Sequence, residues 1–374
     1  MNTRFKNIFF ISYLSLLLLF FSCKSDSNTS VTNTTLFAVK IGDNWGFVDS
    51  TCNFHQELVY QMADEFYLGR AIVQKNNKYS FVDQTGKTLH PFKFSKLTHF
   101  SDDSLAFMLD EKNIISCIDW NFKIVFSLQD AEEIHNYHNG IAAVRKNNKY
   151  GFVNKKGEII INNEFDAVGK FSENLIAVAK YEDLPDTSYL KWFFIDRTGK
   201  QIFDMSFTDV HDFSEGFAAV AINGKWGWMN KSGKFVFGND FQECKSFSEG
   251  YAAFKKGDAW GLINNKGKIV AQPNYFDVGE MHEHFATFSM GPKNVGYIDT
   301  TGNIVIQPQF ESASNFNKGI AYVAKNNQIG LMRKNGTFFC DSKFDSAPNY
   351  WGEFLYLQLN EHIEITVDTV QVNP

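Results

Sequence analysis

The stretch GFAAVAINGKWGWMN, residues 216–230, decides the fold. It consists of an apolar run from Phe217 to Ile222, a tight turn at 223–225 and a second apolar run that starts at Trp226. A further turn at 231–234 leads to a third apolar run. Turns this short force neighbouring strands to be antiparallel, so the stretch predicts a small three-stranded meander and leaves no place for a helix.

The same unit recurs along the chain. Its Trp-Gly anchor is found at Trp45, Trp226 and Trp260, and six weaker copies of the anchor also occur. The nine anchors begin at residues 45, 79, 115, 150, 192, 226, 260, 295 and 329. Neighbouring anchors are 34 to 36 residues apart, except for one spacing of 42. A fixed period of this length is typical of repeat architectures, and nine units fill residues 35–350.

These anchors, the turn glycines that follow them and the Ser-Glu-Gly-x-Ala-Ala segments that precede them resemble the WG-repeat family, also called KWG repeats. The resemblance covers about residues 36–350. It is weakest in the third unit, where Ser116-Cys117 replaces Gly-Phe, and in the fifth, where Phe193 follows Trp192. Membership implies a repeat scaffold, commonly on exported or surface proteins, and implies no known activity.

Two ways of stacking nine all-β units are open. A flat meander of nine three-stranded units would be about 130 Å long at about 4.8 Å per strand, so it would have to coil. A propeller would close the chain into a ring, but its blades normally hold four strands in about 40 to 45 residues. We therefore expect an open or superhelical β-solenoid, with a closed propeller-like ring as the alternative, and a partial repeat and C-terminal cap over residues 351–374.

The cysteines bear on this choice. Cys52, Cys117, Cys244 and Cys340 occupy non-equivalent places in distant units. In an open array they do not meet, whereas a bridge between Cys52 and Cys340 would indicate a closed ring.

The N-terminus has the pattern of an export signal. Arg4 and Lys6 precede an apolar run from Ile8 to Phe21, which is too short to span a bilayer comfortably. The following Ser22-Cys23 resembles the end of a bacterial lipoprotein signal, although an ordinary cleaved signal is the alternative. We expect residues 1–22 to be the lipoprotein signal peptide, Cys23 to be lipidated and residues 23–34 to be a flexible tether. The protein would then be anchored in the bacterial cell envelope, with the outer membrane expected and its face left open.

Composition argues against nucleic acid as a partner and indicates that the aromatic residues belong to the core. The net charge of −6 lacks the basic excess that nucleic-acid binding needs. The 39 Phe residues favour strands and suit packing between repeats better than an exposed binding row. Burial of Trp45, Trp226 and Trp260 would exclude a row of these rings that stacks on sugars.

The sequence offers little chemistry. It has no nucleophile elbow, phosphate loop or His-Glu-x-x-His motif, so we expect no enzyme activity and no cofactor. His282 and His284 could share a strand face, but a metal site needs further ligands, and we expect none. The spacing of 42 is the best candidate for a binding loop, because insertions in repeat arrays often form the binding face. Its candidate residues are Tyr181, Glu182, Asp183, Asp186 and Tyr189.

These features predict a lipid-anchored scaffold of the cell envelope that binds another protein. A glycan or cell-wall binding module is the alternative, and an envelope enzyme is a third hypothesis with less support. The expected partners are the membrane, through the N-terminal lipid, and an unidentified protein or glycan.

Overall fold

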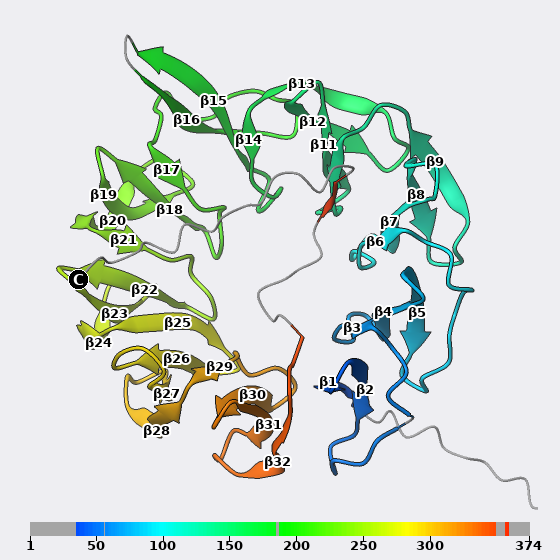
Figure 1. The fold of residues 1–374 in the computed structure, drawn as a ribbon. Helices are drawn as coiled ribbons and strands as arrows, with labels where there is room; N and C mark the ends of the chain where they lie inside the picture. Colours follow the sequence, from blue (N-terminus) through cyan, green and yellow to red (C-terminus); the bar gives the residue numbers. More distant parts are fainter. Residues whose placement is uncertain (1–34, 56, 185–186, 349–355, 359–374) are drawn as a thin grey trace, which may run out of the picture. The chain divides into compact units, whose positions relative to one another are not determined.

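The computed structural model describes residues 35–348, except 56 and 185–186, together with 356–358. The described residues form strands and turns and no helix, as the repeat pattern predicts (Figure 1). They therefore include no helix long and apolar enough to cross a membrane. All of them belong to one compact unit, Thr34–Pro374.

The strands form nine antiparallel sheets that follow one another along the chain. The first three contain β1 (Phe37–Ile41) and β2 (Asn44–Val48); β3 (Met62–Ala63), β4 (Arg70–Lys75) and β5 (Lys78–Asp83); and β6 (Lys96–Leu97), β7 (Leu105–Leu109), β8 (Ile115–Asp119) and β9 (Ile124–Leu128). The fourth contains β10 (Glu133–His135), β11 (Ile141–Lys146), β12 (Lys149–Asn154) and β13 (Ile159–Phe165), and β33 (Tyr356–Gln358) pairs with β10. The fifth and sixth contain β14 (Ala167–Val168), β15 (Ile176–Leu184) and β16 (Thr187–Ile195); and β17 (Asp209–Val210), β18 (Phe217–Ile222), β19 (Lys225–Asn230) and β20 (Phe235–Phe241). The last three contain β21 (Glu243–Cys244), β22 (Tyr251–Lys256), β23 (Ala259–Asn264) and β24 (Ile269–Tyr275); β25 (Asp277–His282), β26 (Phe285–Ser289), β27 (Val295–Asp299) and β28 (Ile304–Phe310); and β29 (Ser312–Ala313), β30 (Ile320–Lys325), β31 (Gln328–Arg333) and β32 (Phe338–Phe344).

Short turns with a defined backbone twist join the two central strands of a sheet. In the sixth sheet both turn residues, Asn223 and Gly224, have positive φ, and Asn76 and Asn77 repeat this geometry in the second. Two consecutive positive φ values match the twist of a two-residue hairpin, and Asn and Gly tolerate them best. The central hairpins of these two sheets therefore turn where their Asn and Gly residues lie.

The anchor glycine lies beneath a bulge of the outer strand. Trp226 pairs with Phe241 while Trp228 pairs with Val236, so β20 carries extra residues opposite Gly227. A Cβ atom on Gly227 would lie 2.5 Å from the backbone oxygen of Gly238. A residue without a side chain is therefore required at this position.

The expected open solenoid is wrong. The sheets close into a ring, the arrangement of a β-propeller, with the two-residue first strands toward its middle (Figure 1). The expectation of three strands per unit missed the innermost strand, which in most sheets has only two residues, as β17 does. Four strands therefore fit into a period shorter than that of ordinary propeller blades.

Backbone pairing and packing both close the ring. Lys40 of β1 pairs with Ser346, which follows β32, so the first sheet receives its innermost segment from the other end of the described chain. The backbone N–H of Asp345 also donates to the oxygen of Lys40 at 2.9 Å. Each of the nine apolar clusters joins two neighbouring sheets, and one of them joins the last sheet to the first. The aromatic residues are thus mainly core between sheets.

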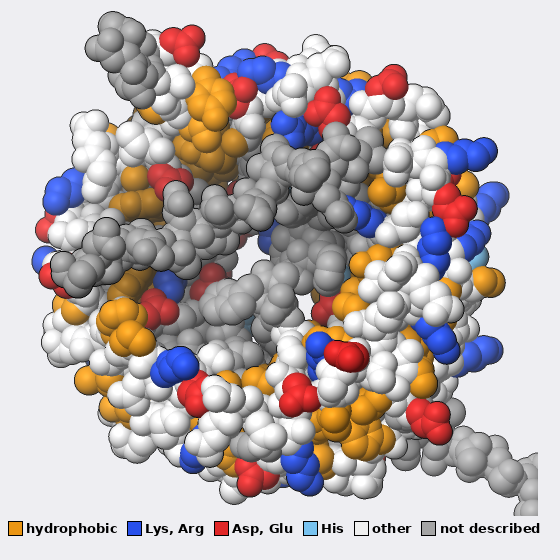
Figure 2. All heavy atoms as spheres, viewed as in Figure 1, with side chains coloured by type: hydrophobic (Ala, Val, Ile, Leu, Met, Phe, Trp, Pro, Cys, Tyr) orange, Lys and Arg blue, Asp and Glu red, His pale blue; other side chains and the backbone are white. Residues whose placement is uncertain are grey.

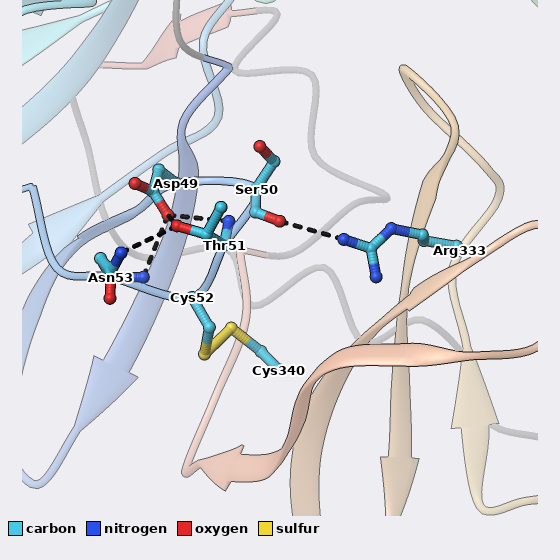
Figure 3. Close-up of a disulfide and its surroundings, with 7 residues drawn as sticks. All are labelled: Asp49, Ser50, Thr51, Cys52, Asn53, Arg333 and Cys340. Atoms are coloured by element: carbon cyan, nitrogen blue, oxygen red, sulfur yellow. Dashed lines mark hydrogen bonds between the residues drawn. A yellow bond between two sulfur atoms is a disulfide. The ribbon is translucent and has the colours of Figure 1, made fainter.

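A disulfide joins Cys52 to Cys340 across the same junction, contrary to the expectation that these cysteines do not meet (Figure 3). Cys52 occupies the place of the turn glycine and shares its positive φ. Cys340 is the third residue of β32, and its equivalent Ile306 in β28 packs near the next turn glycine, Gly336. The disulfide therefore replaces a contact that recurs between sheets elsewhere in the ring.

Candidate functional site

The predicted binding loop is a long hairpin rather than an irregular insertion. β15 and β16 pair continuously from Ile176 opposite Ile195 to Leu184 opposite Thr187. The extra residues lengthen both strands, so the hairpin extends beyond the other strands of its sheet (Figure 1). Asp186 lies outside the described residues.

The two tyrosines of the hairpin lie on opposite faces. Tyr181 pairs with Leu190, and Glu182 pairs with Tyr189. Directly opposed residues share a face and neighbours along a strand alternate, so Tyr181, Leu190 and Asp183 lie on one side. Tyr181 is 59% exposed. Hydrophobic side chains gather over this hairpin in the surface view (Figure 2). The candidate residues therefore do not form one cluster.

The other face of the hairpin is occupied by an internal polar network. Lys191 contacts the Glu182 carboxylate at 2.8 Å, and the Tyr189 hydroxyl donates to it at 3.1 Å. Both hydrogen bonds lower the pKa of Glu182, and the one from Lys191 has the larger effect. This network leaves the Tyr181 face as the apolar side of the hairpin.

The outer edge of the hairpin is open along most of its length. Beyond β16, the described chain pairs with it only over residues 192–195, through Phe207 opposite Trp192, Gln201 opposite Ile195 and a hydrogen bond from the Ile202 N–H to the Phe194 oxygen. No described strand pairs with the outer edge of residues 187–191. An open edge beside an apolar face suits the addition of an extended strand from another protein.

The inner side of the ring holds a second candidate site that the sequence did not reveal. A cavity of about 200 Å³ lies between the fourth and fifth sheets, and His135, Asn136, Lys170 and Asp212 contribute to its lining. Ala143 lines it at a position that holds Phe107 in the third sheet and Tyr322 in the ninth. The sixth and seventh sheets also have alanine at this position, so the residue type alone does not signal a cavity. Sequence reasoning treated such alanines as packing residues and did not compare them between units.

The two histidines considered for a metal do not share a strand face. β25 ends at His282, and Glu283 and His284 follow it with positive φ. His282 lies 3.5 Å from Glu280, and His284 lies 3.6 Å from Glu249. The described part of the chain contains no group of three or more His, Cys, Asp or Glu side chains that could hold a metal ion.

The remaining sequence candidates lie apart from both sites. Cys23 is outside the described residues. Cys117 and Cys244 are buried free thiols, and burial raises the pKa of Cys117 to about 12. Trp260 is buried, and Trp45 and Trp226 are half-buried against apolar clusters, so these three rings form no exposed row.

Comparisons with known proteins agree with the repeat and with the ring. A family model described as "WG containing repeat" matches more than half of the chain, at residues 45–79, 79–112, 132–150, 150–182, 192–226, 226–258, 260–291 and 296–328. None of the curated proteins matches the chain.

Several solved structures are similar to the chain. That of a eukaryotic initiation factor has a TM-score of 0.58 and 10% identity, covering 84% of this chain and 97% of that one. BamB from Moraxella catarrhalis has a TM-score of 0.42 and 8% identity, covering 74% and 94%. The C-terminal WD40 domain of Sif2 has a TM-score of 0.41 and 11% identity, covering 70% and 91%. At this identity, the first of these similarities shows the fold alone.

Proposed function

The chain belongs to the family of WG-containing repeat proteins, and from this premise we propose that it is an exported, lipid-anchored scaffold of the bacterial outer membrane. It binds another protein and carries out no catalysis. The observation that carries the binding proposal is the β15–β16 hairpin, which combines an exposed apolar face with an open strand edge.

Two features support export. Arg4, Lys6 and the apolar run before Cys23 have the pattern of a lipoprotein signal. The Cys52–Cys340 disulfide suits a compartment outside the reducing cytosol, because structural disulfides persist mainly in oxidising environments.

The hairpin suggests how the partner is held. An extended segment of the partner adds to the outer edge of β16, and main-chain hydrogen bonds supply part of the affinity. Its apolar side chains pack against Tyr181 and Leu190, because both lie on the same face. Exposed tyrosines are frequent anchors of protein interfaces.

Paired substitutions test this mode of binding. We expect Tyr181→Ser to weaken partner binding about tenfold or more, since it removes the aromatic anchor. The matched variant Tyr189→Ser should retain binding, because it alters only the opposite face. Partners would be identified by proximity labelling of the tagged chain in native cells, and their affinity would then be measured with the purified proteins.

A shortened hairpin provides a second variant. Replacing residues 181–190 by Asn-Gly restores the turn and the spacing of the sixth unit without touching the sheet core. This variant should fold and lose the partner. Retention of the same partners at the same affinity would contradict the hairpin as the binding site.

Membrane attachment is tested independently at Cys23. Substitution of Cys23 by Ala removes the acceptor of the lipid, and we expect the protein to move from the membrane fraction to the soluble fraction. Fractionation followed by immunoblotting measures this change. Continued membrane retention of the variant would show that the protein is held in another way.

A further inference from the structure

The cavity between the fourth and fifth sheets has the size of a small ring. Its volume is about 200 Å³, and Phe152 and Phe171 form part of its wall. Asn136, Lys170 and Asp212 place polar groups around it. A mostly apolar hollow with a few convergent polar groups is the usual character of a small-ligand site.

The ring contains an internal template for what this cavity can hold. Ala143 is the third residue of β11 and lines the cavity, and Tyr322 is the equivalent third residue of β30. Register confirms the equivalence, because Ala143 pairs with Phe152 and Tyr322 pairs with Leu331. At the junction of the ninth and first sheets, a phenol side chain therefore extends from the position that an alanine methyl occupies at the cavity.

The acceptor of that phenol also has an equivalent at the cavity. The Tyr322 hydroxyl donates to the backbone oxygen of Ala38 at 3.1 Å and to the Glu65 carboxylate. Glu65 directly precedes Phe66, as Asp212 directly precedes Phe213 in the sixth sheet. Asp212 lines the cavity and already accepts the backbone N–H of Lys170 at 3.1 and 3.2 Å. A carboxylate has about four lone-pair sites, so it can take a ligand hydroxyl as a further donor.

Asn136 provides an independent observation that points to a ligand. This side chain lines the cavity and is 7% exposed, and its Oδ1 atom has no hydrogen-bond partner among the described residues. Buried carbonyl oxygens are nearly always paired, because desolvating them without a partner is unfavourable. A donor group of a bound molecule would satisfy it.

We propose that this cavity binds a para-substituted phenol, whose ring lies where a tyrosine ring lies at the junction of the ninth and first sheets. Asp212 and Asn136 are the side chains of the cavity wall whose oxygens can accept from its hydroxyl. The phenol is either a free small molecule or the tyrosine side chain of a bound protein. This site is separate from the β15–β16 hairpin, so either proposal can fail without the other.

Titration of the purified protein tests the chemistry directly. We expect saturable one-site binding of p-cresol by calorimetry or ligand-observed NMR. 4-Methylanisole, in which the hydroxyl is methylated, should bind about tenfold more weakly, as expected for the loss of one hydrogen bond to a charged acceptor. Absence of p-cresol binding, or equal affinity for the ether, would overturn the proposal.

Variants locate the site. Ala143→Tyr supplies the ring from the protein itself, as Tyr322 does, and should abolish p-cresol binding while the protein remains folded by circular dichroism. Asp212→Asn should reduce the preference for p-cresol over 4-methylanisole. This variant tests the site on its own if Ala143→Tyr does not fold. Tyr181→Ser, in the hairpin, should bind p-cresol like the wild type. Unchanged p-cresol binding by both cavity variants would place the phenol elsewhere and overturn the proposal.

A further pair of probes distinguishes the two sources of the phenol. N-acetyl-tyrosinamide binding at least as tightly as p-cresol, with N-acetyl-phenylalaninamide much weaker, supports a tyrosine side chain of a protein partner. Binding of p-cresol without binding of the amide supports a free phenol.

Discussion

Glu65 is a titratable group at the junction where the ring closes. Its carboxylate accepts the Tyr322 hydroxyl and the backbone N–H of Ala38 at 3.2 Å, so it contacts both the last and the first sheet. Burial raises its pKa from 4.5 to about 7, and the neighbouring Asp64 contributes in the same direction. The hydrogen bonds from Tyr322 and Ala38 partly oppose this rise.

The raised pKa of Glu65 predicts how stability depends on pH. The folded state binds this proton more tightly than the unfolded state, so its contribution to the free energy of unfolding falls as pH rises from about 4.5 to about 7 and is constant above. The loss amounts to at most about 3 kcal/mol. We expect Glu65→Gln to remove this fall and to be more stable than the wild type at pH 8. Urea denaturation at several pH values measures the difference, and Glu57→Gln at an exposed position should follow the wild type. Parallel profiles for wild type and Glu65→Gln would contradict the assignment.

At the scale of single strands, the anchor glycine of the sixth sheet makes room for the bulge of the outer strand. The third sheet shows the alternative, because Ser116 occupies the glycine position, pairs regularly with Ser127 and shares a 2.7 Å hydrogen bond with its side chain. In the fifth sheet Phe193 occupies this position, yet Trp192 pairs with Phe207 and Ile195 with Gln201, with the same offsets that Trp226 and Met229 have to their partners in β20. Of the two weakest repeats, the third therefore loses the bulged register and the fifth keeps it.

Substitution of one anchor glycine tests this dependence. Gly227→Ala places a methyl group 2.5 Å from one backbone atom and 2.8 Å from another, so the outer strand must move. We expect a loss of about 1–3 kcal/mol in the free energy of unfolding. Ser116→Ala removes only a hydrogen bond and should cost about 1 kcal/mol or less. Equal costs in chemical denaturation would show that the bulge does not constrain the residue.

The sequence predicts the central strands better than the inner ones. Trp226 and the turn at Asn223-Gly224 are strong local signals, and the strands on either side form where expected. Asp209 and Val210 carry no such signal, because a two-residue strand has no detectable alternation and forms only when its neighbours are in place. This missed strand led to the wrong choice of an open array. The cavity was missed for a related reason, since Ala143 shares its residue type with Ala219 and Ala253 at the same position, and no local pattern distinguishes it from them.

At the scale of the whole molecule, the carboxylates of the Ser-Glu-Gly segments, and of Glu283 at the same position in the eighth unit, connect successive sheets. Glu215 accepts the backbone N–H of Gly250 at 2.8 Å, Glu249 accepts that of Glu283 at 2.7 Å, and Glu283 accepts that of Gly319 at 2.9 Å. Lys318 takes the place of the acidic residue in the last sheet. The junction of the last and first sheets therefore uses other contacts, among them the disulfide and the hydrogen bond from Arg333 to the oxygen of Ser50 at 3.1 Å (Figure 3).

The Cys52–Cys340 disulfide is expected to determine how strongly the ring resists opening. The two residues are 288 positions apart, so the bond restricts nearly the whole described chain in its unfolded state. For a loop of this length the stabilisation is roughly 3–5 kcal/mol.

We expect the double variant Cys52→Ser, Cys340→Ser to unfold at a lower denaturant concentration than the oxidised wild type. The reduced wild type should match the variant, and the variant should not respond to reductant. Peptide mapping without reduction should recover Cys52 joined to Cys340. An oxidised wild type no more stable than the double variant would mean that pairing and packing alone hold the ring closed, because Lys40, Ser346 and the apolar cluster between the last and first sheets are the same in both proteins.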